Sequence, residues 1–87
     1  MNLNELSAAL EAKNIDPSAY SLGGPADCSE TYVIRQRESG VIGKPSYWVT
    51  YYDERGLESG RREFVSEDEA CRHFLEWVSS DTSTRLR

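Results

Sequence analysis

Thiol and imidazole groups are the side chains through which this chain could do nucleophilic chemistry. Its single histidine, His73, lies two positions after Cys71, and its other cysteine is Cys28. Residues two apart on a helix point about 200° away from each other, so Cys71 and His73 are not expected to meet. We place Cys71 on the apolar side of a predicted helix and His73 on its solvent side. Nothing in the sequence supports a pair between Cys28 and His73, so we predict no catalytic residue.

Carboxylates and glycines offer the remaining chemistry. Zinc needs three or four thiolate or imidazole ligands, and one histidine with two scattered cysteines does not supply them. The acidic run Glu67-Asp68-Glu69 is explained by helix capping, and Asp53-Glu54 falls in a turn, where Asp is favoured for local hydrogen bonding. The pair Gly23-Gly24 is not followed by the Gly-Lys-Ser/Thr of a phosphate-binding loop. We therefore expect no enzyme, no metal and no other cofactor.

The segment Asp53-Glu54-Arg55-Gly56 has two interpretations. It is either a solvated hairpin turn with an internal pair between Glu54 and Arg55, or a surface that presents Arg55 and its acidic neighbours to a partner. Arginine and tyrosine are favoured anchors at protein interfaces. The second interpretation predicts a set of partner-binding residues. They are Tyr51, which we expect to be exposed, Asp53, Glu54 and Arg55, together with Asp27 and Glu30 from the loop that precedes the first long strand.

Length and charge limit the classes of function. A chain of 87 residues forms one domain, which we predict over residues 1–79 with a flexible tail over 80–87. The net charge of −5 gives no reason to bind a phosphate backbone, so no nucleic-acid partner is expected. An acidic surface steers toward basic partners, or serves solubility alone. The sequence has no secretory signal and no apolar run of about 20 residues, so we expect a cytoplasmic protein without a membrane partner.

Two amphipathic helices are predicted from apolar residues at helical spacing. Asn2 with Glu5, and Ser66 with Glu69, have the spacing of N-terminal capping boxes. Asn14 can end the first helix in the left-handed conformation. The predicted helices cover residues 3–13 and 67–79.

Strands are predicted where aromatic and β-branched residues gather between turn residues. Gly56 can supply the positive φ of a tight reversal between the last two strands. The predicted strands cover residues 31–36, 46–52 and 58–64, with a short fourth strand at 20–22. Short connections favour hairpins, so we predict an α+β fold: helix, three- or four-stranded antiparallel sheet, helix, in a two-layer sandwich with both helices on one face. Either side of the 46–52 strand is apolar enough to face the helices, and the other side would then leave an aromatic patch exposed.

Three segments resemble one known family. Residues 48–56, Trp-Val-Thr-Tyr-Tyr-Asp-Glu-Arg-Gly, look like its aromatic strand and Glu-Arg-Gly signature. Residues 64–71, with Phe74 and Leu75, resemble the opening of its second helix, and residues 20–24 its glycine turn. Together they are similar to the small α+β immunity proteins of bacterial polymorphic toxin systems, and the resemblance covers most of residues 3–78.

The resemblance implies a function by binding. Such a protein masks a cognate secreted toxin domain in the cytoplasm of the producing cell and its kin, and it is not an enzyme. An acidic inhibitor suits a basic toxin by electrostatic complementarity. Two alternatives compete with this interpretation. One is a small enzyme or ligand-binding domain that uses the 23–30 loop and the 53–55 turn, and the other is an adaptor that self-associates through its sheet, by an exposed aromatic face. Self-association into a homo-oligomer is left open by the sequence.

Overall fold

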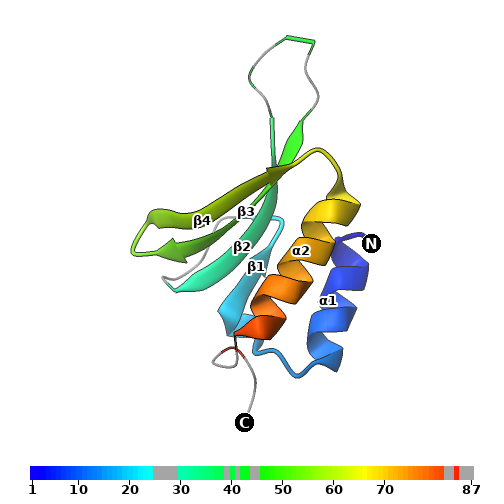
Figure 1. Ribbon diagram of the computed structural model, residues 1–87, viewed down its shortest axis with the longest axis vertical. Coiled ribbons are helices and arrows are strands. Elements are labelled where there is room, and N and C mark those ends of the chain that lie inside the picture. Colours follow the sequence, from blue (N-terminus) through cyan, green and yellow to red (C-terminus); the bar gives the residue numbers. More distant parts are fainter. Residues whose placement is uncertain (25–29, 39, 41, 44–45, 82–83, 85–87) are drawn as a thin grey trace.

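Two helices lie on one side of a four-stranded sheet (Figure 1). The computed structural model describes residues 1–24, 30–38, 40, 42–43, 46–81 and 84. The predicted order of a helix, a sheet and a second helix is confirmed, and the fold is α+β. Its elements are α1 (Leu3–Ala12), the short 3₁₀ turn η1 (Pro17–Ala19), β1 (Tyr20–Leu22), β2 (Thr31–Arg37), β3 (Tyr47–Glu54), β4 (Leu57–Phe64) and α2 (Glu67–Ser80).

The strands follow one another across the sheet in the order β1-β2-β3-β4. The pairs β2–β3 and β3–β4 are antiparallel, as predicted, but β1 pairs with β2 in parallel, with Tyr20 opposite Tyr32. The expectation of a wholly antiparallel sheet is therefore wrong at this one pair. A hairpin cannot join parallel neighbours, so the preference for hairpins over crossovers fails at the connection between β1 and β2.

The strand β4 carries one residue more than the part of β3 that it pairs with. Thr50 lies opposite Arg62, and Tyr52 lies opposite Ser59, so three steps along β4 match two steps along β3. This β-bulge contains Gly60, whose φ is +63°, and a Cβ on that glycine would lie 3.2 Å from the Trp77 ring. The positive φ favours glycine there, and a larger side chain would also crowd the Trp77 ring.

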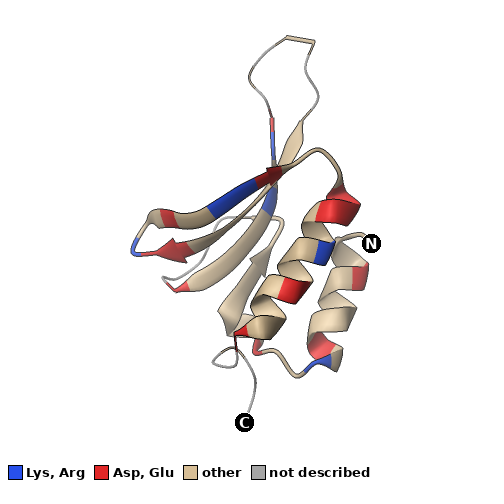
Figure 2. Ribbon diagram, in the orientation of Figure 1, with Lys and Arg blue, Asp and Glu red and all other residues tan. Residues whose placement is uncertain are grey.

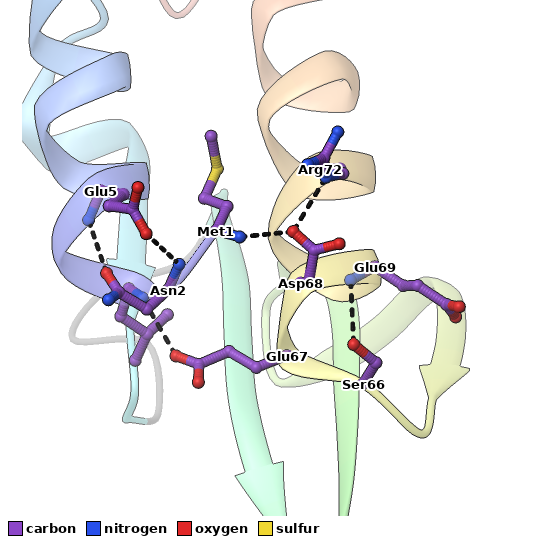
Figure 3. Close-up of polar contacts among 9 residues, drawn as sticks. Met1, Asn2, Glu5, Ser66, Glu67, Asp68, Glu69 and Arg72 are labelled. Carbon is purple, nitrogen blue, oxygen red and sulfur yellow. Dashed lines mark hydrogen bonds and ion pairs between the residues drawn. The ribbon is translucent and has the colours of Figure 1, made fainter.

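Side chains cap the starts of both helices, as Figure 3 shows. The Asn2 side chain accepts a hydrogen bond from the Glu5 backbone N–H at 2.9 Å, and the Glu5 carboxylate accepts one from the Asn2 N–H at 3.2 Å. This is the predicted capping box. Asn14, with a φ of +57°, follows the helix in the predicted left-handed conformation. In α2, the Ser66 hydroxyl accepts from the Glu69 N–H at 3.5 Å, so the predicted N-cap is present, but only this half of the predicted capping box is formed.

Polar contacts also join the N-terminal ends of α1 and α2 (Figure 3). The Met1 amino group donates to the Asp68 carboxylate, which also accepts from Arg72 Nε at 2.8 Å. The carboxylate of the preceding residue, Glu67, accepts a hydrogen bond from the Leu3 N–H at 3.0 Å. The acidic first turn of α2 therefore has two roles. It accepts a hydrogen bond from a backbone N–H of α1, and its negative charges stabilise the positive N-terminal end of the α2 dipole.

The main hydrophobic core lies between the helices and the sheet. From β3, Trp48 and Tyr52 pack toward this core, whereas Tyr47, Val49 and Tyr51 belong to a second, smaller cluster on the opposite side of the sheet. The side of β3 that carries Trp48 and Tyr52 therefore faces the helices, and the other side does not. The buried members of the main core are Leu6, Leu10, Ile15, Tyr32, Ile34, Ala70, Cys71, Phe74 and Val78.

The chain after α2 is held at two of the points that the structure describes. The Tyr32 hydroxyl donates to the Asp81 carboxylate at 2.8 Å. Thr84 is buried, and its carbonyl accepts from the Asp16 N–H at 2.7 Å. The sequence predicts a flexible tail from residue 80. In the structure, Ser80 is instead the last residue of α2, and Asp81 and Thr84 make the contacts given above. The other tail positions lie outside the described residues.

Candidate protein-binding site

A two-residue loop joins β3 to β4 at the free end of their hairpin. Glu54 and Leu57 form the last cross-strand pair, so Arg55 and Gly56 alone make the loop. Their φ values are +53° and +83°, which is the pattern of a type I′ turn. The Asp53 carboxylate accepts a hydrogen bond from the Gly56 N–H at 3.1 Å and closes the turn. The predicted reversal at Gly56 is confirmed.

Arg55 occupies a position that usually takes asparagine or glycine. A side chain longer than that of asparagine is disfavoured in the left-handed region, at a cost of about 1–2 kcal/mol. Arg55 is exposed, and no ion pair joins it to Glu54 among the residues that the structure describes. The internal Glu54–Arg55 pair of the first interpretation is therefore not formed. The guanidinium at the hairpin tip is left for solvent or for another molecule.

Leu57 adds an apolar side chain beside this arginine. It is 73% exposed at the start of β4, directly after the loop. Leu57 was not predicted to belong to the site, although an apolar residue in an otherwise polar edge strand is a visible signal in the sequence. Apolar contact area next to an arginine is the composition expected at the centre of a protein interface.

Acidic side chains gather at the same end of the sheet, where Figure 2 shows them in red. Thr31 pairs with Asp53, so Glu30, one residue earlier, reaches the hairpin end of β3. Burial raises the pKa of the Tyr52 hydroxyl, and the negative charges of Glu30, Glu54 and Asp81 raise it further. Three predicted residues, Glu30, Asp53 and Glu54, are thereby brought together with Arg55. Asp27 lies outside the described residues.

Tyr51 is not exposed, contrary to the expectation from the sequence. Its relative exposure is 3%, although it lies on the face of the sheet that no described helix covers. The guanidinium carbon of Arg37 lies 5.7 Å from the centre of the Tyr51 ring and covers it. Tyr51 supports the sheet from within and is no direct contact residue.

An ionic network crosses this second face of the sheet. Arg37 pairs with Tyr47 in the register near one end of β2, yet its guanidinium bonds Glu58 of β4 at 2.6 Å. Because Glu58 lies opposite Asp53, at the other end of β3, the Arg37–Glu58 pair runs diagonally over the strand between. This hydrogen bond is the main reason that the pKa of Arg37 is raised. Arg61 extends the network, with Glu58 at 3.7 Å and Glu63 at 3.6 Å.

The exposed aromatic sheet face that the adaptor alternative needs is therefore not formed. Val33 and Val49 are fully buried on this side, and Tyr51 lies under Arg37. Elsewhere, a groove of about 570 Å³ lies along α2, and Leu75 supplies apolar surface to it. The groove is lined by Met1, Lys13, Arg72, Leu75, Glu76, Ser79 and Ser80, none of which belongs to the 23–30 loop or the 53–55 turn.

Cys71 and His73 do not meet, in agreement with the helical spacing. Cys71 is fully buried, and burial raises the pKa of its thiol to about 11, which disfavours the reactive thiolate. His73 is half-buried between the rings of Phe64, at 5.3 Å, and Trp77, at 5.6 Å, so its predicted solvent position is only partly right. Cys28 lies outside the described residues.

Comparisons with protein-family models, with curated proteins and with solved structures return no match for this chain. In the part of the chain that the structure describes, no cluster of three or more metal-ligating side chains is present. No helix there has the length and apolar character needed to span a membrane.

Proposed function

We propose that this protein is an immunity protein, which neutralises a cognate bacterial toxin domain by stoichiometric binding in the cytoplasm. The observation that carries the proposal is Arg55, exposed at the tip of the β3–β4 hairpin in a left-handed conformation. The resemblance of residues 48–56 to the Glu-Arg-Gly signature of such proteins supports the same segment.

The left-handed backbone conformation of Arg55 destabilises the fold, and its side chain makes no contact with the described residues that offsets this cost. Asparagine or glycine would form the same turn with less backbone strain, and the arginine makes no ion pair with the residues that the structure describes. Strained residues that persist at exposed positions are typical of functional sites. A long side chain that ends in a planar guanidinium, beside exposed Leu57, is suited to insert into a partner.

The acidic residues around the hairpin suit a basic partner. Glu30 and Glu54 are exposed at this end of the sheet, and the chain carries a net charge of −5. Charges at the rim of an interface mainly raise the association rate and suppress wrong partners. We therefore assign the affinity to Arg55 and Leu57, and the rate of encounter to Glu30 and Glu54.

The decisive experiment replaces Arg55 by asparagine. Arg55→Asn relieves the left-handed strain, so the free energy of unfolding should rise by up to about 1 kcal/mol. The same variant should lose protection when it is co-expressed with the toxin domain encoded beside it, and should no longer co-purify with that domain. Lys13→Asn, which removes an exposed cation from the end of α1, is the matched control and should protect fully.

The outcomes separate the site from the function. Full protection by Arg55→Asn would show that the hairpin is not the contact, while a protective wild-type chain would still be an immunity protein. A wild-type chain that neither rescues growth nor binds the toxin domain would contradict the proposed function itself. Loss of protection together with loss of stability would contradict the assignment of Arg55 as a strained functional residue.

A further inference from the structure

One end of the β3–β4 hairpin extends past the helices, on the side of the sheet that they cover elsewhere (Figure 1). Cross-strand partners share a face of the sheet, and so do residues two apart on a strand. Tyr52 lies opposite Ser59, and Glu54 lies opposite Leu57, so all four belong to the side on which Tyr52 packs toward the main core. We call these four residues the open face of the hairpin.

Aromatic rings form the inner border of the open face. The centre of the Tyr52 ring lies 4.8 Å from that of Tyr32, and the Trp77 ring lies at the same distance from Tyr32. A Cβ on Gly60 would lie 3.2 Å from the Trp77 ring, so this ring stands against β4. Tyr52 and Trp77 are only half-buried, and Leu57 is 73% exposed at the outer end. Half-buried rings beside an exposed leucine are a composition expected at a protein interface.

The charges around the Tyr52 ring are negative. Glu30 precedes β2 and stands beside Glu54, because β2 and β3 pair in antiparallel register. Asp81, at the C-terminal end of α2, is the third carboxylate and accepts from the Tyr32 hydroxyl at 2.8 Å. Burial raises the pKa of the Tyr52 hydroxyl, and all three negative charges raise it further. Figure 2 shows these segments in red at the start of β2, the end of β3 and the end of α2.

The opposite face of the same hairpin neutralises its carboxylate within the fold, since Glu58 is bonded to Arg37 at 2.6 Å. Glu30 and Glu54, in contrast, form no ion pair with any residue that the structure describes. Arg62 lies on the same side as the open face, but past the bulge and toward the other end of β4. Neighbouring carboxylates without a cation repel each other, so a positive group that enters between them stabilises both.

We infer that the open face of the hairpin seats a lysine or arginine side chain of the partner, with its charge over the Tyr52 ring and between Glu30 and Glu54. The face of a tyrosine ring attracts a cation, and carboxylates add charge-assisted hydrogen bonds. The inference rests on the proposed function, because it takes the partner to be a basic toxin domain. It adds which side of the hairpin the partner covers, and Leu57 connects that side to Arg55 at the tip.

The first test needs no toxin domain. Ring ¹H–¹³C signals are followed while an acetylated, amidated tri-arginine peptide is added, with the uncharged tri-citrulline peptide as its control. The Tyr52 signals should shift with tri-arginine and saturate, whereas those of Tyr47, on the opposite face, should not move. Tyr20 reports general attraction to an acidic protein, since burial and the charges of Glu11 and Asp16 raise its pKa. No tri-arginine-specific shift at Tyr52, or an equal shift at Tyr20, would overturn the inference.

The second test measures the rate of dissociation from the toxin domain. Tyr52→Phe keeps the ring and should dissociate as the wild type does. Pentafluorophenylalanine at position 52 has nearly the same shape but lacks the negative ring face, so its complex should dissociate about 5- to 30-fold faster. Glu30→Gln should mainly slow association. Tyr47→Leu, on the opposite face, is the control and should change neither rate. Urea unfolding checks that each variant is folded.

The outcomes separate the inference from the proposed function. Equal dissociation rates for the phenylalanine and pentafluorophenylalanine variants would overturn the inference, while a wild type that binds the toxin domain would remain an immunity protein. A wild type that does not bind the toxin domain would contradict the proposed function, and the inference with it. Faster dissociation of the pentafluorophenylalanine variant, together with a tri-arginine-specific shift at Tyr52, would support the inference.

Discussion

The two faces of the sheet are stabilised by different forces. On the helix side, Ile34 and Phe74 are fully buried in a continuous apolar core. On the other side, Val33 and Val49 are equally buried, but an ionic network led by Arg37 covers the small cluster that they form. Burial fraction alone does not distinguish the two sides. The difference is that one face excludes water with hydrocarbon and the other with paired charges, so the two should respond differently to mutation, salt and pH.

The largest effect is expected on the helix side. Phe74→Ala leaves a cavity in the centre of the main core, where the side chain has no exposed surface, and should lower the free energy of unfolding by about 3–5 kcal/mol. Urea unfolding measures this loss directly. Because the contact is apolar, the loss should be nearly the same in 1 M sodium chloride. A loss below about 1 kcal/mol would mean that the helices contribute little to the fold, and the proposed contrast between the faces would disappear.

A smaller, salt-dependent effect is expected on the other face. Arg37→Met keeps much of the apolar stem over Tyr51 but removes the ion pair with Glu58. Both partners are partly exposed, so the loss should be about 1 kcal/mol at low salt. It should shrink in 1 M sodium chloride, where charges are screened over about 3 Å. Urea curves of the variant and the wild type at both salt concentrations test this, and a loss that salt does not change would assign Arg37 a packing role instead.

The smallest effect is a pH dependence on the helix side. Burial between Phe64 and Trp77 lowers the pKa of His73, and the positive charge of Arg62 lowers it further. The unfolded chain therefore binds this proton more readily than the folded one, so the stability contributed by neutral His73 is present above about pH 6.5 and is lost as the pH falls. Unfolding free energies at pH 7.5 and 5.5 should differ less for His73→Phe than for the wild type. An identical difference in both proteins would show that His73 does not titrate against folding.

Local features of the fold were predictable from the sequence because they depend on residues that are close together in the chain. The capping pairs Asn2–Glu5 and Ser66–Glu69 and the reversal at Gly56 depend on a few adjacent positions. The parallel pairing of β1 was missed, because it depends on where the chain passes between Leu22 and Thr31 and not on the residues of the strand.

The site was predictable only in part, for the same reason. Glu30, Asp53, Glu54 and Arg55 do meet at one end of the sheet, since the β2–β3 register follows from the hairpin order. The burial of Tyr51 was not predictable, because it depends on an arginine 14 positions earlier whose side chain crosses a whole strand.

The bulge at Gly60 has a consequence for how molecules of this protein meet one another at high concentration. An edge strand normally offers a regular row of amide and carbonyl groups to any passing chain, which is the first step toward fibrils. In β4 the row changes phase at Gly60, where the Trp77 ring lies against the backbone. A straight strand from a neighbouring copy can match the row before this point or the row after it, but never both, so the edge interrupts the template that ordered aggregation requires.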